Sequence, residues 1–206
     1  MRLVLVRHGQ SEGNARNVIQ GHLDFGLTEL GLKQAQATAQ RLAGQRFDRI
    51  LTSPLLRATA TAELIAAATG APVEPEPALR EYALGHVAGL TFEEVAARHP
   101  EILQAYRQGI RPSFPGEEGR DVFLARVRSV LDRWMESGES ILAVVHGGVV
   151  SAMCYLVLGL DDRRPGIFRV ANCSITEFVN QRGRVVIQRH NDTCHLQGIL
   201  TMEDVG

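Results

Sequence analysis

Short apolar runs alternate along this chain with longer segments in which apolar residues recur at helical spacing. The runs 3–6 (Leu-Val-Leu-Val) and 141–145 (Ile-Leu-Ala-Val-Val) are continuous and rich in β-branched residues, which is typical of buried strands. Segment 49–52 predicts a third, shorter strand. Segments 174–180 and 184–188, separated by Arg182-Gly183, predict a hairpin that would supply antiparallel strands at one edge of a sheet.

Helical patterns fill the intervals between these strands. Thr28 is the expected N-cap of a helix that ends at Gly44, with an apolar face formed by Leu32, Ala35, Ala39 and Leu42. Ser53-Pro54 predicts the start of an alanine-rich helix that ends at Gly70. Further helices are expected after the capping box Thr91–Glu94, over 121–136 and over 149–158. Alternating strands and helices predict a three-layer α/β/α sandwich with a mostly parallel central sheet and an antiparallel edge.

The 206 residues suffice for one sizeable core, so we expect a single catalytic domain over 1–206. The pattern is looser from Pro72 onward, with a glycine- and proline-bearing loop at 109–119. Segment 79–119 is too short and too poor in apolar residues to hold a core of its own. We therefore interpret it as a small helical insertion beside the site, without independent stability.

Composition excludes several classes of function. The hydrophobic fraction of 45% and charged fraction of 22% are ordinary for a globular protein, and the net charge of -1 favours neither nucleic acid nor an anionic membrane as a partner. No apolar stretch has membrane-spanning length, and we expect no signal peptide. The three cysteines are odd in number and widely spaced, which favours a reduced, cytoplasmic setting.

The candidate chemistry lies where the two long predicted strands end. One strand ends in Arg7-His8-Gly9 and the other in His146-Gly147-Gly148. Because the carboxyl ends of adjacent parallel strands meet at one sheet edge, both imidazoles are expected there. Arg57, near the start of the helix after Ser53-Pro54, would add a guanidinium and a helix N-terminus. These groups predict a site for one phosphate-sized anion.

The same residues carry a family resemblance. Segment 7–14 (Arg-His-Gly-Gln-Ser-Glu-Gly-Asn) resembles the signature of the histidine phosphatase superfamily, also called phosphoglycerate mutase-like. The resemblance continues through 27–31, 53–62, Leu79-Arg80-Glu81, Gly85 with Gly89, and 145–148, and so covers nearly the whole chain in order.

This resemblance implies a metal-independent phosphomonoester hydrolase that needs no cofactor and acts on a small phosphorylated metabolite. His8 would be the nucleophile that becomes a phosphohistidine, and Glu81 would protonate the leaving alcohol. The phosphate oxygens would be held by Arg7, Asn14, Gln20, Arg57 and His146. Segment 105–112 lacks the adjacent arginine pair of the mutase branch, and Pro115-Gly116-Glu117 is closer to the phosphatase branch.

Two rival functions remain open: a cofactor-dependent phosphoglycerate mutase, and a non-catalytic module that binds phosphate. The presence of both His8 and Glu81 argues against the second, because a pure binder needs neither a nucleophile nor a proton donor. Segment 190–195 holds ligand-type side chains at a spacing that fits no standard zinc site. It resembles a C-terminal Asn-Asp-x-x-His-Leu stretch of many phosphatases of this superfamily, and this resemblance implies a structural role near the site, although the role of the segment stays open. The role of His86, the identity of the ester, and the choice between a monomer and a homodimer stay open.

Overall fold

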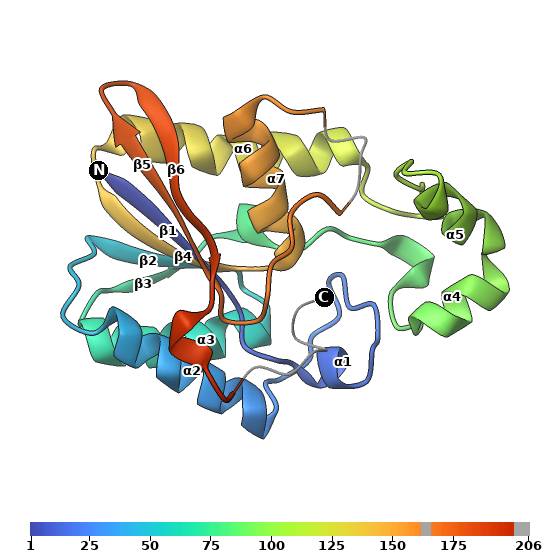
Figure 1. Ribbon diagram of the computed structural model, residues 1–206, viewed down its shortest axis with the longest axis horizontal. Helices are drawn as coiled ribbons and strands as arrows, with labels where there is room; N and C mark the ends of the chain where they lie inside the picture. The colour runs from blue at the N-terminus through green and yellow to red at the C-terminus, as the bar shows by residue number, and fades with distance from the viewer. Residues whose placement is uncertain (162–165, 200–206) are drawn as a thin grey trace.

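The computed structural model describes residues 1–161 and 166–199. A six-stranded sheet of order β3-β2-β4-β1-β5-β6 forms its centre (Figure 1). The strands are β1 (Arg2–Arg7), β2 (Arg49–Thr52), β3 (Val73–Pro75), β4 (Ser140–Val145), β5 (Ile175–Gln181) and β6 (Arg184–Asp192). The first four are parallel, whereas β5 and β6 form an antiparallel edge, as predicted. The short edge strand β3 was not predicted.

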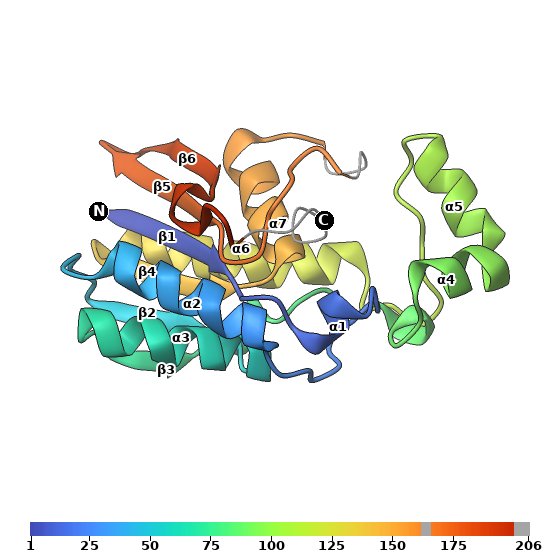
Figure 2. The same ribbon diagram turned by 60° about the horizontal axis from the view of Figure 1, so that its bottom comes forward.

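Helices cover both faces of the sheet. They are α1 (Glu12–Ala15), α2 (Glu29–Leu42), α3 (Leu56–Thr69), α4 (Phe92–Arg98), α5 (Pro100–Arg107), α6 (Arg120–Ser137) and α7 (Gly147–Leu158). Short 3₁₀ turns occur at Pro77–Leu79, Gly85–Val87 and Cys194–Leu196. Figures 1 and 2 show α2 and α3 on one side of the sheet and α6 and α7 on the other.

Alternation along the central strand explains these layers. Leu3 and Leu5 of β1 belong to the apolar cluster that contains the buried faces of α6 and α7. Val4 and Val6 belong to the cluster on the opposite side, with α2 and α3. Successive strand residues point to opposite faces, so a continuous apolar run is what a strand covered on both faces requires. The predicted three-layer α/β/α fold is confirmed.

The helix boundaries confirm most of the predicted caps. The Thr28 hydroxyl accepts a hydrogen bond from the Gly31 amide, and Thr91 and Glu94 form the expected capping box. Gly70 and Gly159 end their helices in the left-handed conformation, which glycine adopts without steric cost. Helix α5 was missed and lies directly after α4, with Pro100 in its first turn.

Two details of the helical pattern were wrong. Leu32 is 42% exposed, and the buried face of α2 instead includes Gln34, whose Oε1 accepts a hydrogen bond from the Gln10 amide. The helix expected to start at Ser53-Pro54 begins at Leu56, and Leu55 occupies its N-cap position without a side-chain hydrogen bond. Ser53 has another partner, described below.

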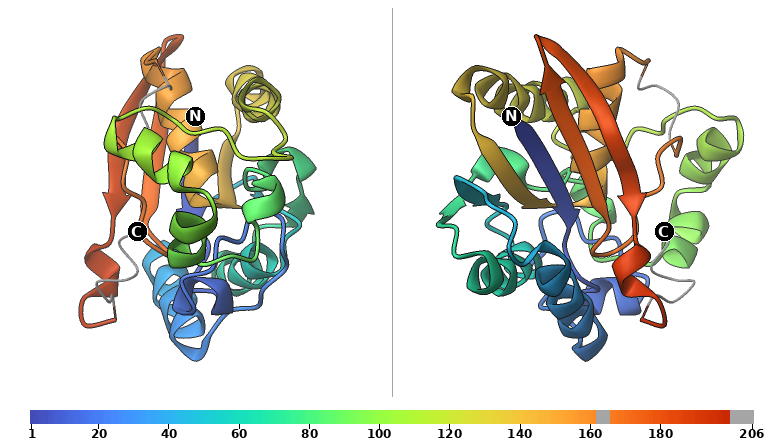
Figure 3. Two further views of the ribbon diagram at one scale, coloured as in Figure 1. Left: turned by 90° about the vertical axis from the view of Figure 1, so that its right-hand side faces the viewer. Right: turned by 60° about the vertical axis from the view of Figure 1, so that its left-hand side comes forward.

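The segment around α4 and α5 projects from one end of the molecule (Figures 2 and 3). Its buried apolar residues Val87, Val95, Ile102 and Phe114 belong to the same cluster as Phe123 and Trp134 of α6. The base of this segment therefore packs on the main core, beside the edge of the sheet at which β1 and β4 end.

Candidate active site

The sheet register brings the two histidines together. Strands β1 and β4 are parallel neighbours that pair Arg7 with Val145, so the following residues, His8 and His146, leave the sheet side by side. Their ring centroids are 5.1 Å apart, with the ring planes inclined by 60°. His8 is 3% exposed and His146 is completely buried. The prediction that both imidazoles share one edge of the sheet is confirmed.

The backbone after β1 orients the His8 ring. The Nδ1 atom of His8 lies 2.7 Å from the carbonyl oxygen of Gly9, so Nδ1 carries the proton and donates it. The other ring nitrogen, Nε2, is then the nitrogen with a free electron pair. A Cβ atom at Gly9 would lie 2.5 Å from the Gly31 carbonyl oxygen, so this close approach of two backbones requires glycine.

Both histidines are kept neutral. Burial lowers the pKa of His8 well below its usual value of 6.5, and the charges of Arg57 and Arg7 lower it further. Burial also lowers the pKa of His146, with smaller effects from His8, Arg57 and Arg7. A neutral imidazole with a free electron pair is a competent nucleophile, whereas an imidazolium is not.

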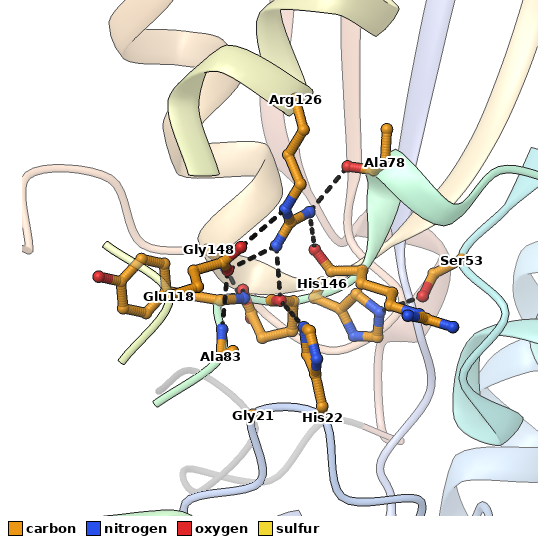
Figure 4. A network of polar contacts seen from close by, with 12 residues as sticks. Gly21, His22, Ser53, Ala78, Ala83, Glu118, Arg126, His146 and Gly148 are labelled. Atoms are coloured by element: carbon orange, nitrogen blue, oxygen red, sulfur yellow. Dashed lines mark hydrogen bonds and ion pairs between the residues drawn. The ribbon is translucent and has the colours of Figure 1, made fainter. Parts of the chain in front are cut away.

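Ser53 positions His146. Its hydroxyl oxygen lies 2.7 Å from His146 Nε2, and both residues are completely buried. Figure 4 shows the two side chains. The serine that sequence analysis interpreted as a helix cap is thus a partner of the second histidine. His146 Nδ1 is buried and has no hydrogen-bond partner within 1–161 and 166–199.

Two guanidinium groups flank the histidine pair. Arg7 donates to the carbonyl oxygen of Val170. Arg57, which is 1% exposed, donates to the carbonyl oxygens of Leu23 and Gly21 at 2.8 and 2.9 Å. Burial lowers the pKa of Arg57 to about 10, so its guanidinium is still charged at neutral pH. A buried cation held by carbonyl oxygens retains charge for binding an anion.

Asn14 and Gln20 belong to a network at the N-terminal loop. The Asn14 Oδ1 atom accepts a hydrogen bond from the Ser11 amide at 3.0 Å, and Gln20 Oε1 accepts one from the Ser11 hydroxyl at 2.7 Å. With their oxygens occupied, the amide nitrogens of both side chains are the groups left to donate. A Cβ at Gly13 would lie 2.5 Å from the Gln20 side chain, so a larger residue there would displace Gln20 from this position.

Asn172 joins this network to His8 and was missed by sequence analysis. Its Nδ2 atom donates to the His8 carbonyl oxygen at 2.9 Å and to Asn14 Oδ1 at 3.4 Å. The residue is 1% exposed and lies in the loop before β5. A single asparagine in a loop has no periodic or local signal, because its contacts are more than 150 residues away in the sequence.

Glu81 reaches the same edge of the sheet through the first turn of α7, which follows His146. One carboxylate oxygen accepts a hydrogen bond from the Gly148 amide in the first turn of α7 at 3.0 Å, and the other accepts from the Tyr82 amide at 2.8 Å. The charge of Glu81 also acts on Arg57. A Cβ at Gly148 would lie 2.2 Å from Glu81 Oε1, so this glycine makes room for the carboxylate.

Three other histidines, His86, His190 and His195, have their contacts elsewhere. His86 is exposed and packs against Gly116. His190 contacts Cys154 and Thr176, whereas His195 contacts Thr38 of α2 and the Cys173 carbonyl oxygen. Among the described residues, no three His, Cys, Asp or Glu side chains lie close enough together to hold a metal ion. Segment 190–195 connects the edge strand β6 to α2 through the contact between His195 and Thr38. Tyr82 and Val87 are core residues with 6% and 0% exposure.

The match to a known family agrees with this geometry. Residues 3–193 match the model of the histidine phosphatase superfamily (branch 1). The chain belongs to the histidine phosphatase superfamily. The matched span includes every residue of the site described above, from Arg7 to Asn172, and it confirms the resemblance found in the sequence.

Relatives within the superfamily include both phosphatases and mutase-like proteins. Phosphoserine phosphatase 1 of Hydrogenobacter thermophilus is 34% identical over 199 residues, which is 95% of this chain and 94% of the relative. Phosphoglycerate mutase-like protein 4 of Arabidopsis thaliana is 34% identical over 205 residues, with 95% and 86% covered. A solved mycobacterial glucosyl-3-phosphoglycerate phosphatase in complex with VO3 superposes with a TM-score of 0.85 at 32% identity, over 93% of this chain and 99% of that one.

Within the described part of the chain, no helix is both long and apolar enough to cross a bilayer.

Proposed function

We propose that this superfamily member is a phosphomonoesterase that hydrolyses a small phosphorylated metabolite through a phosphohistidine at His8. The observation that carries the proposal is the buried pair of neutral imidazoles, 5.1 Å apart, flanked by the guanidinium groups of Arg7 and Arg57. A neutral nucleophile beside fixed positive charge suits an electrophile that carries negative oxygens.

In the first step, Nε2 of His8 attacks phosphorus and the bond to the ester oxygen breaks. Arg7, Arg57 and His146, with the amides of Asn14 and Gln20, bind the three remaining phosphate oxygens while charge spreads over them. Glu81, protonated at this stage, transfers its proton to the departing alkoxide, so that the products are a neutral alcohol and phospho-His8. The hydrogen bond from Nδ1 to Gly9 keeps Nε2 directed at phosphorus.

In the second step, a water molecule attacks the phosphorus of phospho-His8. Glu81, now ionised, accepts a proton from that water, and the bond from phosphorus to nitrogen breaks. The electron pair returns to Nε2, inorganic phosphate leaves, and Glu81 is protonated for the next cycle. One glutamate therefore serves both steps without any other proton donor.

Hydrolysis is favoured over mutase chemistry by the short segment at 105–112, which has no adjacent arginine pair to hold a second acidic group. The relatives named as phosphatases act on phosphoserine and glucosyl-3-phosphoglycerate, and we infer an ester of similar size here. A panel of phosphate esters, assayed with a chelator present, identifies the substrate. Conversion of 3-phosphoglycerate to 2-phosphoglycerate without phosphate release would replace the hydrolase by the mutase.

The phosphohistidine is tested by trapping it. The wild-type protein, mixed with a ³²P-labelled substrate and quenched in alkali, should carry label that is stable to base and lost in acid, at His8. His8→Ala should carry no label and have no turnover, while His86→Ala, at an exposed histidine, should behave as the wild type. Label on His8→Ala, or undiminished turnover by it, would refute the nucleophile.

The proposal extends to the organisation of the protein. We infer one catalytic domain over 1–206, with 79–119 as an insertion that does not fold alone, because its apolar residues share the main core. The three cysteines are free thiols, of which Cys154 and Cys173 are buried, and this supports a cytoplasmic location. A homodimer remains a hypothesis that sedimentation equilibrium would test.

A further inference from the structure

Arg126 of α6 makes an unusually complete set of hydrogen bonds beside the site. Its Nε and Nη2 atoms donate to the two carboxylate oxygens of Glu118 at 3.0 and 2.7 Å. Its Nη1 atom donates to the carbonyl oxygens of Ala78 and Arg80 at 2.8 and 2.5 Å, and Nη2 also donates to that of Glu81 at 2.8 Å. All five N–H groups of the guanidinium are thus used (Figure 4).

Glu118 also binds the backbone on the C-terminal side of Glu81, at Ala83. Its Oε1 atom accepts a hydrogen bond from the Ala83 amide at 2.8 Å, and its own amide donates to the Ala83 carbonyl oxygen at 3.1 Å. The Arg126 and Glu118 side chains are 18% and 15% exposed, so their ion pair is largely shielded from solvent. Together they hold the backbone at 78, 80, 81 and 83.

The backbone that carries Glu81 needs such support. Residues 80–84 form no helix and no strand, so no ladder of regular hydrogen bonds fixes them. The Glu81 carbonyl oxygen is held from one side by Arg126 and from the other by His22 Nε2 at 2.7 Å. Its carboxylate meets the Gly148 amide at 3.0 Å only if this backbone stays in place.

We infer that Arg126, paired with Glu118, is a positioning residue that fixes Glu81 for proton transfer to the leaving group. This inference depends on the proposed function, in which Glu81 is the acid. Lysine cannot replace the arginine, because its single nitrogen has three N–H groups and cannot reach five acceptors in a planar fork. Loss of the fork would let the Glu81 backbone move while leaving His8, Arg7 and Arg57 untouched.

The leaving group distinguishes this role from a general loss of structure. An alkyl phosphate releases a strongly basic alkoxide and needs the proton from Glu81, whereas 2,4-dinitrophenyl phosphate releases a stable phenolate that needs none. A misplaced acid therefore slows the first substrate and spares the second. Because kcat/KM reports steps up to departure of the alcohol, it is the quantity to compare.

The experiment measures kcat/KM of Arg126→Lys with both esters, and inhibition by inorganic phosphate. We expect a loss of about 10- to 100-fold for the alkyl ester, less than about threefold for the dinitrophenyl ester, and unchanged inhibition by phosphate. Glu81→Gln should show the same selectivity. Arg128→Lys, an exposed arginine on the same helix, is the matched control and should stay within about twofold of the wild type in every assay.

The double variant Glu81→Gln/Arg126→Lys decides whether Arg126 acts through Glu81. If it does, Arg126→Lys adds no further loss for the alkyl ester once Glu81 is replaced. Additive losses, or equal losses for both esters, would overturn the inference and make Arg126 a purely structural residue. If Arg126→Lys does not fold, Glu118→Gln, which keeps an acceptor for the Ala83 amide, must show the same selectivity for the inference to stand.

The outcomes also separate this inference from the proposed function. A wild-type protein that hydrolyses neither ester refutes the function. A Glu81→Gln variant without selectivity refutes the acid, and the inference falls with it. Selectivity in Glu81→Gln but not in Arg126→Lys leaves the function intact and refutes the role of Arg126 alone.

Discussion

Gly148 offers a substitution that should separate activity from stability. It is the second residue of α7, and its amide donates to Glu81 Oε2. A Cβ atom built there would lie 2.2 Å from Glu81 Oε1 and 3.0 Å from its carboxyl carbon. In Gly148→Ala, the Glu81 carboxylate must move away by about 1 Å or more to reach van der Waals distance.

The two consequences have opposite signs. A displacement of about 1 Å at a catalytic group costs on the order of 100-fold in rate, or about 2.7 kcal/mol in transition-state free energy. The fold should not suffer, because the group that must move is the end of a flexible side chain. Alanine in place of glycine within a helix contributes roughly 0.5–1 kcal/mol of stability, so the free energy of unfolding should be unchanged or slightly higher.

The assay is kcat/KM for an alkyl phosphate, measured beside urea denaturation of the same preparation. Gly147→Ala is the matched control, since its Cβ would lie 3.8 Å from the nearest atom, Arg7 Nε, which is an ordinary contact. We expect a much smaller loss of activity for Gly147→Ala. Full activity in Gly148→Ala would refute the reasoning, because the position of the Glu81 carboxylate would then not matter for the reaction.

Three further predictions concern the histidines and their partners. Four histidines, His8, His146, His190 and His195, have pKa values lowered below 6.5 in the folded protein. Below pH 6.5 the unfolded chain therefore binds more protons than the folded chain. The free energy of unfolding should fall as the pH decreases through 6.5. Urea denaturation at pH 7.5 and pH 5.5 measures this difference in the free energy of unfolding, and equal stability at both pH values would contradict the prediction. The lowered pKa of Asp192 affects stability only at still lower pH. Ser53→Ala removes the partner of His146 Nε2 and should weaken inhibition by inorganic phosphate, at a cost of about 1–3 kcal/mol in stability. Thr59→Ala is the control and should change neither, because Thr59 is only half-buried and its hydroxyl donates a solvent-exposed hydrogen bond to the Leu56 carbonyl oxygen of its own helix. Asn172→Ala should lower kcat/KM by about tenfold, because the His8 carbonyl oxygen and Asn14 Oδ1 both lose a donor; unchanged kinetics with a lower Tm would limit Asn172 to a structural role.

Much of this protein follows from local patterns in its sequence. The apolar runs at 3–6 and 141–145 specify buried strands because both of their faces must be covered, and the caps at Thr28, Thr91 and Gly70 act within one turn of each helix end. Parallel strands meet at one sheet edge, so the pairing of His8 with His146 also follows once both strands are recognised.

Only the tertiary structure decided how these side chains are held. Ser53 has the local features of a helix cap, yet its hydroxyl is bonded to His146, 93 residues later. Asn172 and Arg126 have no local pattern at all, and each contacts the site across 45 or more residues. Hydrogen bonds between distant residues depend on the final packing of loops, so neither periodicity nor spacing in the sequence can predict them.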